Sequence, residues 1–315
     1  MWPTGSSIRE FDIEMTSTEI IAGRSPWQEA WRRLLKNRLA VFGMAMVTVV
    51  LLAVLLGPSL IFWATGVTYD YIPSNPELVK SLRPSVEHPM GTDIAGRDLL
   101  ARVLLGGRIS LMVGIISTFV SLLIGVAYGA TAGYLGGKVD EVMMRFVDIL
   151  YAIPYMMIVI VLLALFGGQS PLGQLFLLFL ALGAVSWLTM ARIVRGQVIS
   201  LKNQEFVTAA RAGGVSQTKI IFRHLVPNCV GPVIVYSTLQ VPSVMLLEAF
   251  LSFLGLGVQA PLASWGSLAA DGIQTIAIFP WQLIFPGITM AVTLFSLNFI
   301  GDGLRDALDP RMKKQ

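Results

Sequence analysis

The residues best able to do chemistry are few and widely spaced in this chain of 315 residues. The single cysteine, Cys229, excludes an intramolecular disulfide and argues against a cysteine-based metal site. The two histidines, His88 and His224, lie far apart in the sequence and lack the spacing of metal ligands. These residues therefore predict neither redox nor metal chemistry.

A short basic turn at 136–138 reads Gly-Gly-Lys and contains the Gly-Lys pair of a phosphate-binding loop. The motif is incomplete because Ala132 stands where its first glycine belongs and Val139 replaces the Ser or Thr. No other Walker motif and no Ser/His/Asp constellation is apparent in the sequence. We predict that the chain is not an enzyme, has no catalytic, cofactor-binding or metal-binding residues, and does not itself hydrolyse ATP.

Residues 201–228 form the longest polar stretch between the later apolar segments. Small residues recur there at helical spacing and make one helix face narrow. Gly213-Gly214 can end this helix, since glycine enters the left-handed region at little cost. Ser216 can then cap a second helix, and Pro227 limits its continuation. The stretch predicts helix, glycine turn and helix outside a bilayer.

The rest of the composition indicates a membrane protein. With 55% hydrophobic and 13% charged residues, the chain is too apolar for an ordinary soluble domain. Since a spanning helix needs roughly 20 mainly apolar residues, we predict an all-α polytopic fold with six spans. The spans lie at about 39–63, 109–132, 142–166, 174–193, 229–254 and 281–301. A polar loop at 64–105 and a loop at 255–272 without Lys or Arg separate some of them, and Pro154 can kink the third span.

The predicted transmembrane domain, residues 39–304, lies between a polar arm at 1–38 and a tail at 305–315. Four apolar residues of the arm fall on one helical face beside basic residues, which predicts an interfacial helix. These residues are Trp27, Trp31, Leu34 and Leu35.

Small residues occupy every fourth position along the second span. They are Ser117, Ser121, Gly125, Gly129 and Gly133, which we call the small-residue stripe. Such a stripe allows two helices to approach closely in lipid. It therefore predicts a helix-packing surface, although a face toward lipid is the alternative.

Lys and Arg are unevenly distributed between the connections. The arm, the Lys138 turn, residues 201–228 and the tail are basic, whereas 167–173 and 255–280 contain neither residue. With six spans, these basic segments all fall on one side, which the positive-inside rule assigns to the cytoplasm. The loop at 64–105 is the exception, with Lys80, Arg83, Arg97 and Arg102, but the length of this loop reduces its weight in the rule. We expect both termini in the cytoplasm and attribute the net charge of +4 to this pattern rather than to nucleic-acid binding.

Several motifs resemble those of permease subunits in bacterial ABC importers of peptides and nickel. Thr208-Ala209-Ala210, Gly213 and Val226-Pro227 resemble the coupling loop of that superfamily, with Thr208 in place of the usual Glu. Further segments resemble peptide-permease motifs, and the C subunits of oligopeptide permeases are the nearest group. These segments are HPMGTDIAGRDLLARVLLGGRISL, MARIVRGQVISLK, EAFLSFLGLGVQAPLASWG and NFIGDGLRDALDPR.

The resemblance implies an importer of oligopeptides in the bacterial inner membrane, working by alternating access. Its expected partners are a homologous second permease, two cytoplasmic ATPases that bind ATP and Mg, an extracytoplasmic peptide-binding protein and the peptide. Coupling to the ATPases would fall to Glu205, Phe206, Ala209, Ala210, Gly213 and Gly214.

Glu248 is the main candidate for an ionisable residue inside the membrane. Two interpretations stay open: it lines the path or an outer gate, or it makes a buried hydrogen bond to a neighbouring helix. Scarce intramembrane carboxylates and no convincing internal repeat weigh against the rival class, an ion-coupled secondary transporter. Dipeptides, nickel or another small solute remain alternative cargoes.

Overall fold

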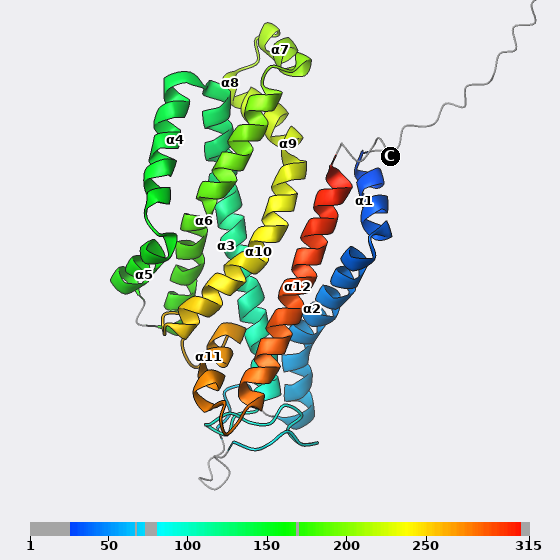
Figure 1. The fold of residues 1–315 in the computed structure, drawn as a ribbon, viewed down its shortest axis with the longest axis vertical. Helices are drawn as coiled ribbons and strands as arrows, with labels where there is room; N and C mark the ends of the chain where they lie inside the picture. The colour runs from blue at the N-terminus through cyan, green and yellow to red at the C-terminus, as the bar shows by residue number, and fades with distance from the viewer. Residues whose placement is uncertain (1–25, 67, 73–80, 168–169, 310–315) are drawn as a thin grey trace, which may run out of the picture.

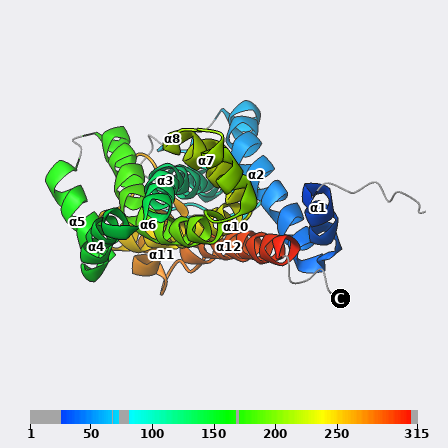
Figure 2. The same ribbon diagram turned by 90° about the horizontal axis from the view of Figure 1, so that it is seen from above.

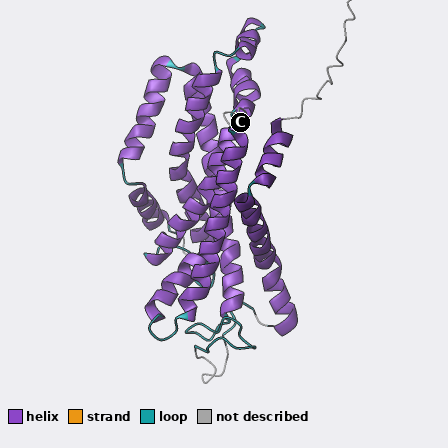
Figure 3. Ribbon diagram, turned by 45° about the vertical axis from the view of Figure 1, so that its right-hand side comes forward, coloured by secondary structure: helices purple, strands orange, loops and turns teal. Residues whose placement is uncertain are grey.

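The computed structural model describes residues 26–66, 68–72, 81–167 and 170–309. Residues 1–25 of the predicted arm at 1–38 and residues 310–315 of the predicted tail at 305–315 lie outside the described residues. The elements are α1 (Pro26–Lys36), α2 (Arg38–Thr65), α3 (Leu99–Leu135), α4 (Gly137–Ala152), α5 (Tyr155–Phe166), α6 (Pro171–Leu201), α7 (Glu205–Ala212), α8 (Gln217–Lys219), a π-helical segment η1 (Ile220–Leu225), α9 (Val226–Asn228), α10 (Val230–Phe253), α11 (Trp265–Thr275) and α12 (Trp281–Leu308). Figure 3 shows helices and loops throughout the described part of the chain.

The long helices run side by side, with α7 at one end of the bundle and α11 near the other (Figure 1). We refer to these as the α7 end and the α11 end. Five helices, α2, α3, α6, α10 and α12, are long and apolar enough to cross a membrane, and the bent pair α4–α5 makes a sixth if it counts as one span. The all-α polytopic fold predicted from the sequence is confirmed.

Several helices extend beyond the predicted spans. The second begins at Leu99, ten residues before the expected 109, because Asp98 caps it by accepting a hydrogen bond from the Ala101 amide at 2.8 Å. The fourth continues to Leu201, and the sixth to Leu308, so the boundary at 304–305 falls inside a helix. Hydropathy marks the apolar part of a helix, whereas helical hydrogen bonding continues into polar residues.

The third span is broken rather than kinked. Its two halves, α4 and α5, meet at Ile153 and Pro154 with a bend of 81°. Proline cannot donate a backbone hydrogen bond and disfavours helical geometry in the residue before it. Ile153 accordingly has an extended backbone, with φ −84° and ψ 128°.

Two other local predictions were wrong. Pro227 does not limit the helix after the glycine turn, because α8, η1, α9 and α10 follow one another almost without interruption. The wider π-helical turn before the proline changes the hydrogen-bond pattern there. The loop at 255–272 also contains most of α11, which Ser264 begins with a capping box shared with Ser267.

α3 and α6 form the centre of the bundle, flanked by α10, while α2 and α12 pack together at one side (Figure 2). The terminal helix α1 packs on α12 and α2 through Ala30 and Leu34. Trp27 and Trp31, from the predicted interfacial face, are 52% and 57% exposed, whereas Leu34 is buried. The exposed tryptophans fit an interfacial helix, and Leu34 fixes it to the bundle.

Candidate functional site

The short helix α7 projects beyond α3 and α6 at its end of the bundle (Figure 1). Val207 anchors it and is fully buried in a cluster with Tyr134, Val198 and Ile220. Arg211 adds a second anchor, since its Nε donates to Tyr134 Oη at 3.3 Å and its Nη2 to the Lys202 carbonyl at 3.4 Å. The helix is therefore held as a rigid part of the bundle.

The anchor residues were missed by the sequence analysis, which selected the small residues of the helix. Val207 is the one large aliphatic residue in the segment EFVTAARA, and that feature could have identified it. The partners of Arg211 lie 77 and 9 residues away, at Tyr134 and Lys202, so spacing along the sequence gives no sign of them.

The turn after α7 has a defined hydrogen-bond pattern. The Val215 amide donates to the Ala210 carbonyl at 3.1 Å, and the Gly214 amide donates to the Arg211 carbonyl at 3.0 Å. This is a Schellman motif, which needs a left-handed residue after the helix. Gly214 supplies it with φ +73°, whereas Gly213 has φ −78°. The helix ends where the two glycines predicted an end, but their conformational roles differ.

The six residues assigned to coupling divide between two environments. Glu205, Phe206 and Ala209 are exposed, as are both glycines of the turn. Ala210 is half-buried and packs toward the cluster around Val207. Ser216 stands at the start of α8, but its side chain makes no capping hydrogen bond. The free surface of α7 thus combines the apolar side chains of Phe206 and Ala209 with the charged side chain of Glu205.

The small-residue stripe lies on the face of α3 that meets α6. A Cβ built on Gly125 would lie 2.6 Å from Met190 Cβ, and one on Gly133 would lie 2.8 Å from the Arg195 carbonyl oxygen. Gly129 is tighter still, against the Ala191 backbone, and Ser117 Oγ donates to the Phe179 carbonyl at 3.1 Å.

Ser121 is the member of the stripe that reaches a third helix. Its hydroxyl donates to Gln240 Oε1 in α10 at 3.4 Å. All five stripe residues are buried. The stripe therefore brings α3 against α6 at backbone distance and reaches α10 through Ser121.

Two arginines of the segment MARIVRGQVISLK join α6 to α4. Arg195 makes a two-point ion pair with Asp140, at 2.5 and 2.6 Å, and Arg192 contacts Asp148 at 2.7 Å. Two parallel hydrogen bonds fix the orientation of the guanidinium, and the carboxylate of Asp140 neutralises its charge. The sequence analysis assigned these arginines no role because their partners lie 55 and 44 residues away.

Glu248 belongs to α10, is 1% exposed and contacts the start of α11. Its Oε1 accepts hydrogen bonds from Ser252 Oγ at 2.6 Å and from Ser264 Oγ at 2.7 Å. Beside it, the Trp265 amide donates to Ser110 Oγ of α3 at 3.0 Å. Of the two interpretations of Glu248, the buried hydrogen bond is the one that this geometry matches.

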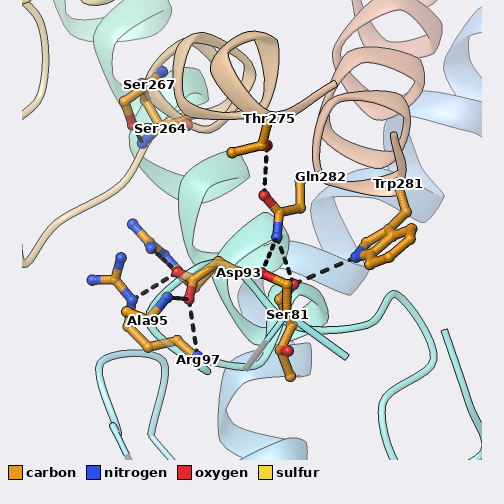
Figure 4. A network of polar contacts seen from close by, with 11 residues as sticks. Ser81, Asp93, Ala95, Arg97, Ser264, Ser267, Thr275, Trp281 and Gln282 are labelled. Atoms are coloured by element: carbon orange, nitrogen blue, oxygen red, sulfur yellow. Dashed lines mark hydrogen bonds and ion pairs between the residues drawn. The ribbon is translucent and has the colours of Figure 1, made fainter. Parts of the chain in front are cut away.

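A polar network closes the α11 end of the molecule (Figure 4). Gln282 lies at its centre, where its Oε1 accepts from Thr275 and its Nε2 donates to Ser81 Oγ at 3.1 Å and to the Thr92 carbonyl at 3.0 Å. Asp93 pairs with Arg97 at 2.7 Å and with Arg102. The loop before α3 is thereby fixed to α11 and α12.

Comparisons with known proteins agree with this architecture. Residues 102–314 match the family described as "Binding-protein-dependent transport system inner membrane component". Residues 25–84 match the family described as "N-terminal TM domain of oligopeptide transport permease C". The first match spans the helices from α3 to α12, and the second spans α1 and α2.

The chain is also similar over most of its length to curated permeases. It is 51% identical to the oligopeptide transport system permease protein OppC of Escherichia coli (strain K12), over 92% of this chain and 93% of the relative. The OppC of Haemophilus influenzae is 49% identical over 92% and 90%. The dipeptide transport system permease protein DppC of Bacillus subtilis is 43% identical over 91% and 86%.

Proposed function

Because the chain belongs to the family of binding-protein-dependent transport system inner membrane components, we propose that it carries oligopeptides across the cytoplasmic membrane in an ATP-driven importer. Relatives named as oligopeptide permeases are 43–51% identical to it over the aligned residues, and a dipeptide permease is 43% identical. Dipeptides are therefore the second cargo to test. The importer would also contain a second permease, two ATPases and an extracytoplasmic binding protein.

The observation that carries the mechanism is the exposed surface of α7. Phe206 and Ala209 point away from the bundle, while Val207 and Arg211 hold the helix firmly to α3 and α6. A rigid projecting helix can transmit the movement of a bound ATPase to the membrane helices. Closure of the ATPases on ATP would then switch the peptide path from outward-facing to inward-facing. ATP and Mg would bind in the ATPases.

This mechanism requires the α7 end to lie in the cytoplasm. The connections at that end carry the basic residues Lys138, Lys202, Arg211 and Lys219, while α11 and its flanking loop at 255–280 have neither Lys nor Arg. The positive-inside rule supports this orientation. It gives an inner-membrane protein with both termini in the cytoplasm.

The test is ATP-dependent uptake of tri- to pentapeptides by the complete importer in proteoliposomes. We expect uptake to need the ATPases and the binding protein. Ala209→Asp, on the exposed face of α7, should insert normally but lose most ATPase association and uptake. Gln259→Asp puts the same charge on an exposed position at the α11 end and is the control.

Two results would contradict the proposal. Uptake driven by an ion gradient without the ATPases would indicate a secondary transporter instead. Equal retention of ATPase by the Ala209→Asp and Gln259→Asp variants would exclude α7 as the coupling element.

A further inference from the structure

The helix bundle contains a pocket of about 370 Å³. Its lining includes Gln240 and the break at Ile153–Pro154. The break of α4 and α5 forms one wall, and α6 and α10 form the others. Each wall contributes residues from near its midpoint, namely Pro154, Ser186 and Gln240. The pocket therefore lies near half depth in the bundle, and its volume is in the range of small-ligand sites.

Gln240 is the residue that distinguishes this pocket from a packing defect. It is 5% exposed, and its Oε1 accepts a hydrogen bond from Ser121 Oγ at 3.4 Å. Its Nε2 has no hydrogen-bond partner among the described residues. If the amide is turned around, Nε2 takes the serine and Oε1 is left over. Either way one buried polar atom needs a partner, because such atoms are unfavourable when unpaired.

Several hydroxyl groups of the lining already make hydrogen bonds within the protein. Ser186 Oγ donates to the Leu182 carbonyl at 2.7 Å, and Ser243 Oγ to the Leu239 carbonyl at 3.1 Å. Tyr151 and Thr189 hydrogen-bond to each other through their hydroxyl groups. Each hydroxyl oxygen keeps capacity to accept a further hydrogen bond. The pocket thus presents acceptors from hydroxyls and an amide that needs a partner.

Charged side chains are absent from the lining of this pocket. The charges beside it neutralise each other, since Arg192 pairs with Asp148 at 2.7 Å. The same guanidinium lies 4.0 Å from the centre of the Tyr151 ring, so it stacks on the wall rather than entering the pocket. Such a lining suits uncharged amide groups of a ligand, which offer both carbonyl and N–H groups.

The break between α4 and α5 also indicates a ligand site. Non-helical backbone at membrane depth is stable where it is covered by protein or lines a cavity. Transporters commonly build substrate sites from discontinuous helices near the midplane. The break at Ile153 and Pro154 lines this pocket. The backbone break, which is unfavourable in a membrane helix, and the unpaired Gln240 amide therefore line the same pocket.

We propose that this pocket binds the peptide backbone during translocation, with the Gln240 amide pairing with a backbone amide of the cargo. The inference rests on the proposed function and adds a place for the cargo inside this chain. Recognition through backbone amides, without charged contacts, lets one site accept peptides of different sequence. A side chain of the second permease or a lipid tail in the pocket is the competing occupant.

The experiment measures uptake of trialanine, trilysine and triglutamate by the complete importer in proteoliposomes. Gln240→Leu should lower the maximal rate for trialanine about three- to tenfold, as expected for one lost hydrogen bond. Thr238→Val is the matched control on the same helix, because the Thr238 hydroxyl donates to its own helix at Ile234. That variant should stay within about twofold of the wild-type rate.

Gln240→Glu tests whether the pocket senses the charge of the peptide, which a purely structural role of Gln240 would not affect. A carboxylate in this uncharged lining should reduce triglutamate uptake, relative to wild type, about tenfold more than trilysine uptake. Equal reductions for the two charged peptides would overturn the proposal, as would equal effects of Gln240→Leu and Thr238→Val.

Crosslinking tests the pocket independently if the Gln240 variants fail to assemble. Tyr155 lines the pocket and is 54% exposed, so a photoreactive benzoylphenylalanine there should crosslink to radiolabelled trialanine during ATP turnover. Crosslinks to the second permease or to lipid alone would overturn the proposal. A wild-type importer that takes up none of the three peptides would instead refute the proposed cargo, which separates that failure from an error in the pocket.

Discussion

Gly213 and Gly214 are neighbours in the sequence, but they have different backbone conformations. Gly214 has φ +73° with open space where a Cβ would lie, whereas Gly213 has φ −78° and room for an ordinary contact. A side chain at Gly214 is therefore penalised by backbone conformation and not by a clash within this chain. The left-handed region costs an L-residue about 1–2 kcal/mol.

This difference gives a matched pair of substitutions. We expect Gly214→Ala to loosen the end of α7 and to lower peptide-stimulated ATP hydrolysis of the assembled importer several-fold. Gly213→Ala should leave hydrolysis near the wild-type rate, because alanine adopts its backbone angles freely. Hydrolysis per assembled complex is the measurement, and equal rates for the two variants would contradict the role of the turn.

Gly129 and Gly196 form a second pair, now in membrane helices. A methyl group at Gly129 would collide with the Ala191 backbone, whereas nothing lies within 4 Å of a Cβ at Gly196. Gly129→Ala should therefore cost about 1–3 kcal/mol, as overpacking does. Gly196→Ala should be neutral or slightly stabilising, since alanine favours helix.

Thermal stability of the complex in detergent, measured with each glycine variant in turn, tests this prediction. The Gly129→Ala complex should lose assembly at a lower temperature than the Gly196→Ala complex. If the two melt together, α3 and α6 are separated more widely than the structure has them, and the small-residue stripe faces lipid.

At the scale of elements, α11 is held in place by three hydrogen bonds to two helices. Glu248 accepts from Ser264 at the start of α11, Ser110 accepts from the Trp265 amide, and the indole Nε1 of Trp265 donates to the Val103 carbonyl at 2.8 Å. The helix is therefore tied to α10 and α3 through buried polar groups.

Replacing Glu248 tests how much this attachment contributes. Glu248→Ala leaves two serine hydroxyls without their acceptor and should destabilise the α11 end by about 1–3 kcal/mol. Glu248→Gln keeps an oxygen in the same place and should cost less. Protease cleavage in the 255–264 segment measures this attachment: we expect faster cleavage in the Ala variant than in the Gln variant, and equal cleavage would show that Glu248 does not hold α11.

At the scale of the whole molecule, the orientation in the membrane can be tested by labelling single cysteines in a Cys229→Ser background. Ser264, in the segment at 255–272, is fully buried and therefore unsuitable as a labelling position. Val86 is 99% exposed near the α11 end, and Ser216 is exposed at the α7 end. An impermeant maleimide added to intact cells should label Val86→Cys and spare Ser216→Cys until the cells are opened. Labelling of both from outside would contradict the proposed topology.

The sequence by itself determined the features that depend on local chemistry. Apolar runs of spanning length determined the order of the five long membrane helices and the place of the bent pair α4–α5, because burying such runs in lipid is a property of each segment alone. The two glycines determined where α7 ends, and proline at 154 marked the weak point of the third span. The small-residue stripe indicated a close helix contact, but it could not indicate that α6 would be the partner.

Only the tertiary structure decided which distant groups meet. It placed Val207 inward and Phe206 outward on α7, and it placed the helix α11, anchored by the buried Trp265, in the loop before α12. It paired Arg192 with Asp148, 44 residues away, and left the Gln240 amide without a full set of partners beside the broken helix. These outcomes depend on which side chains compete for each buried polar group, and that competition exists only after the helices have packed.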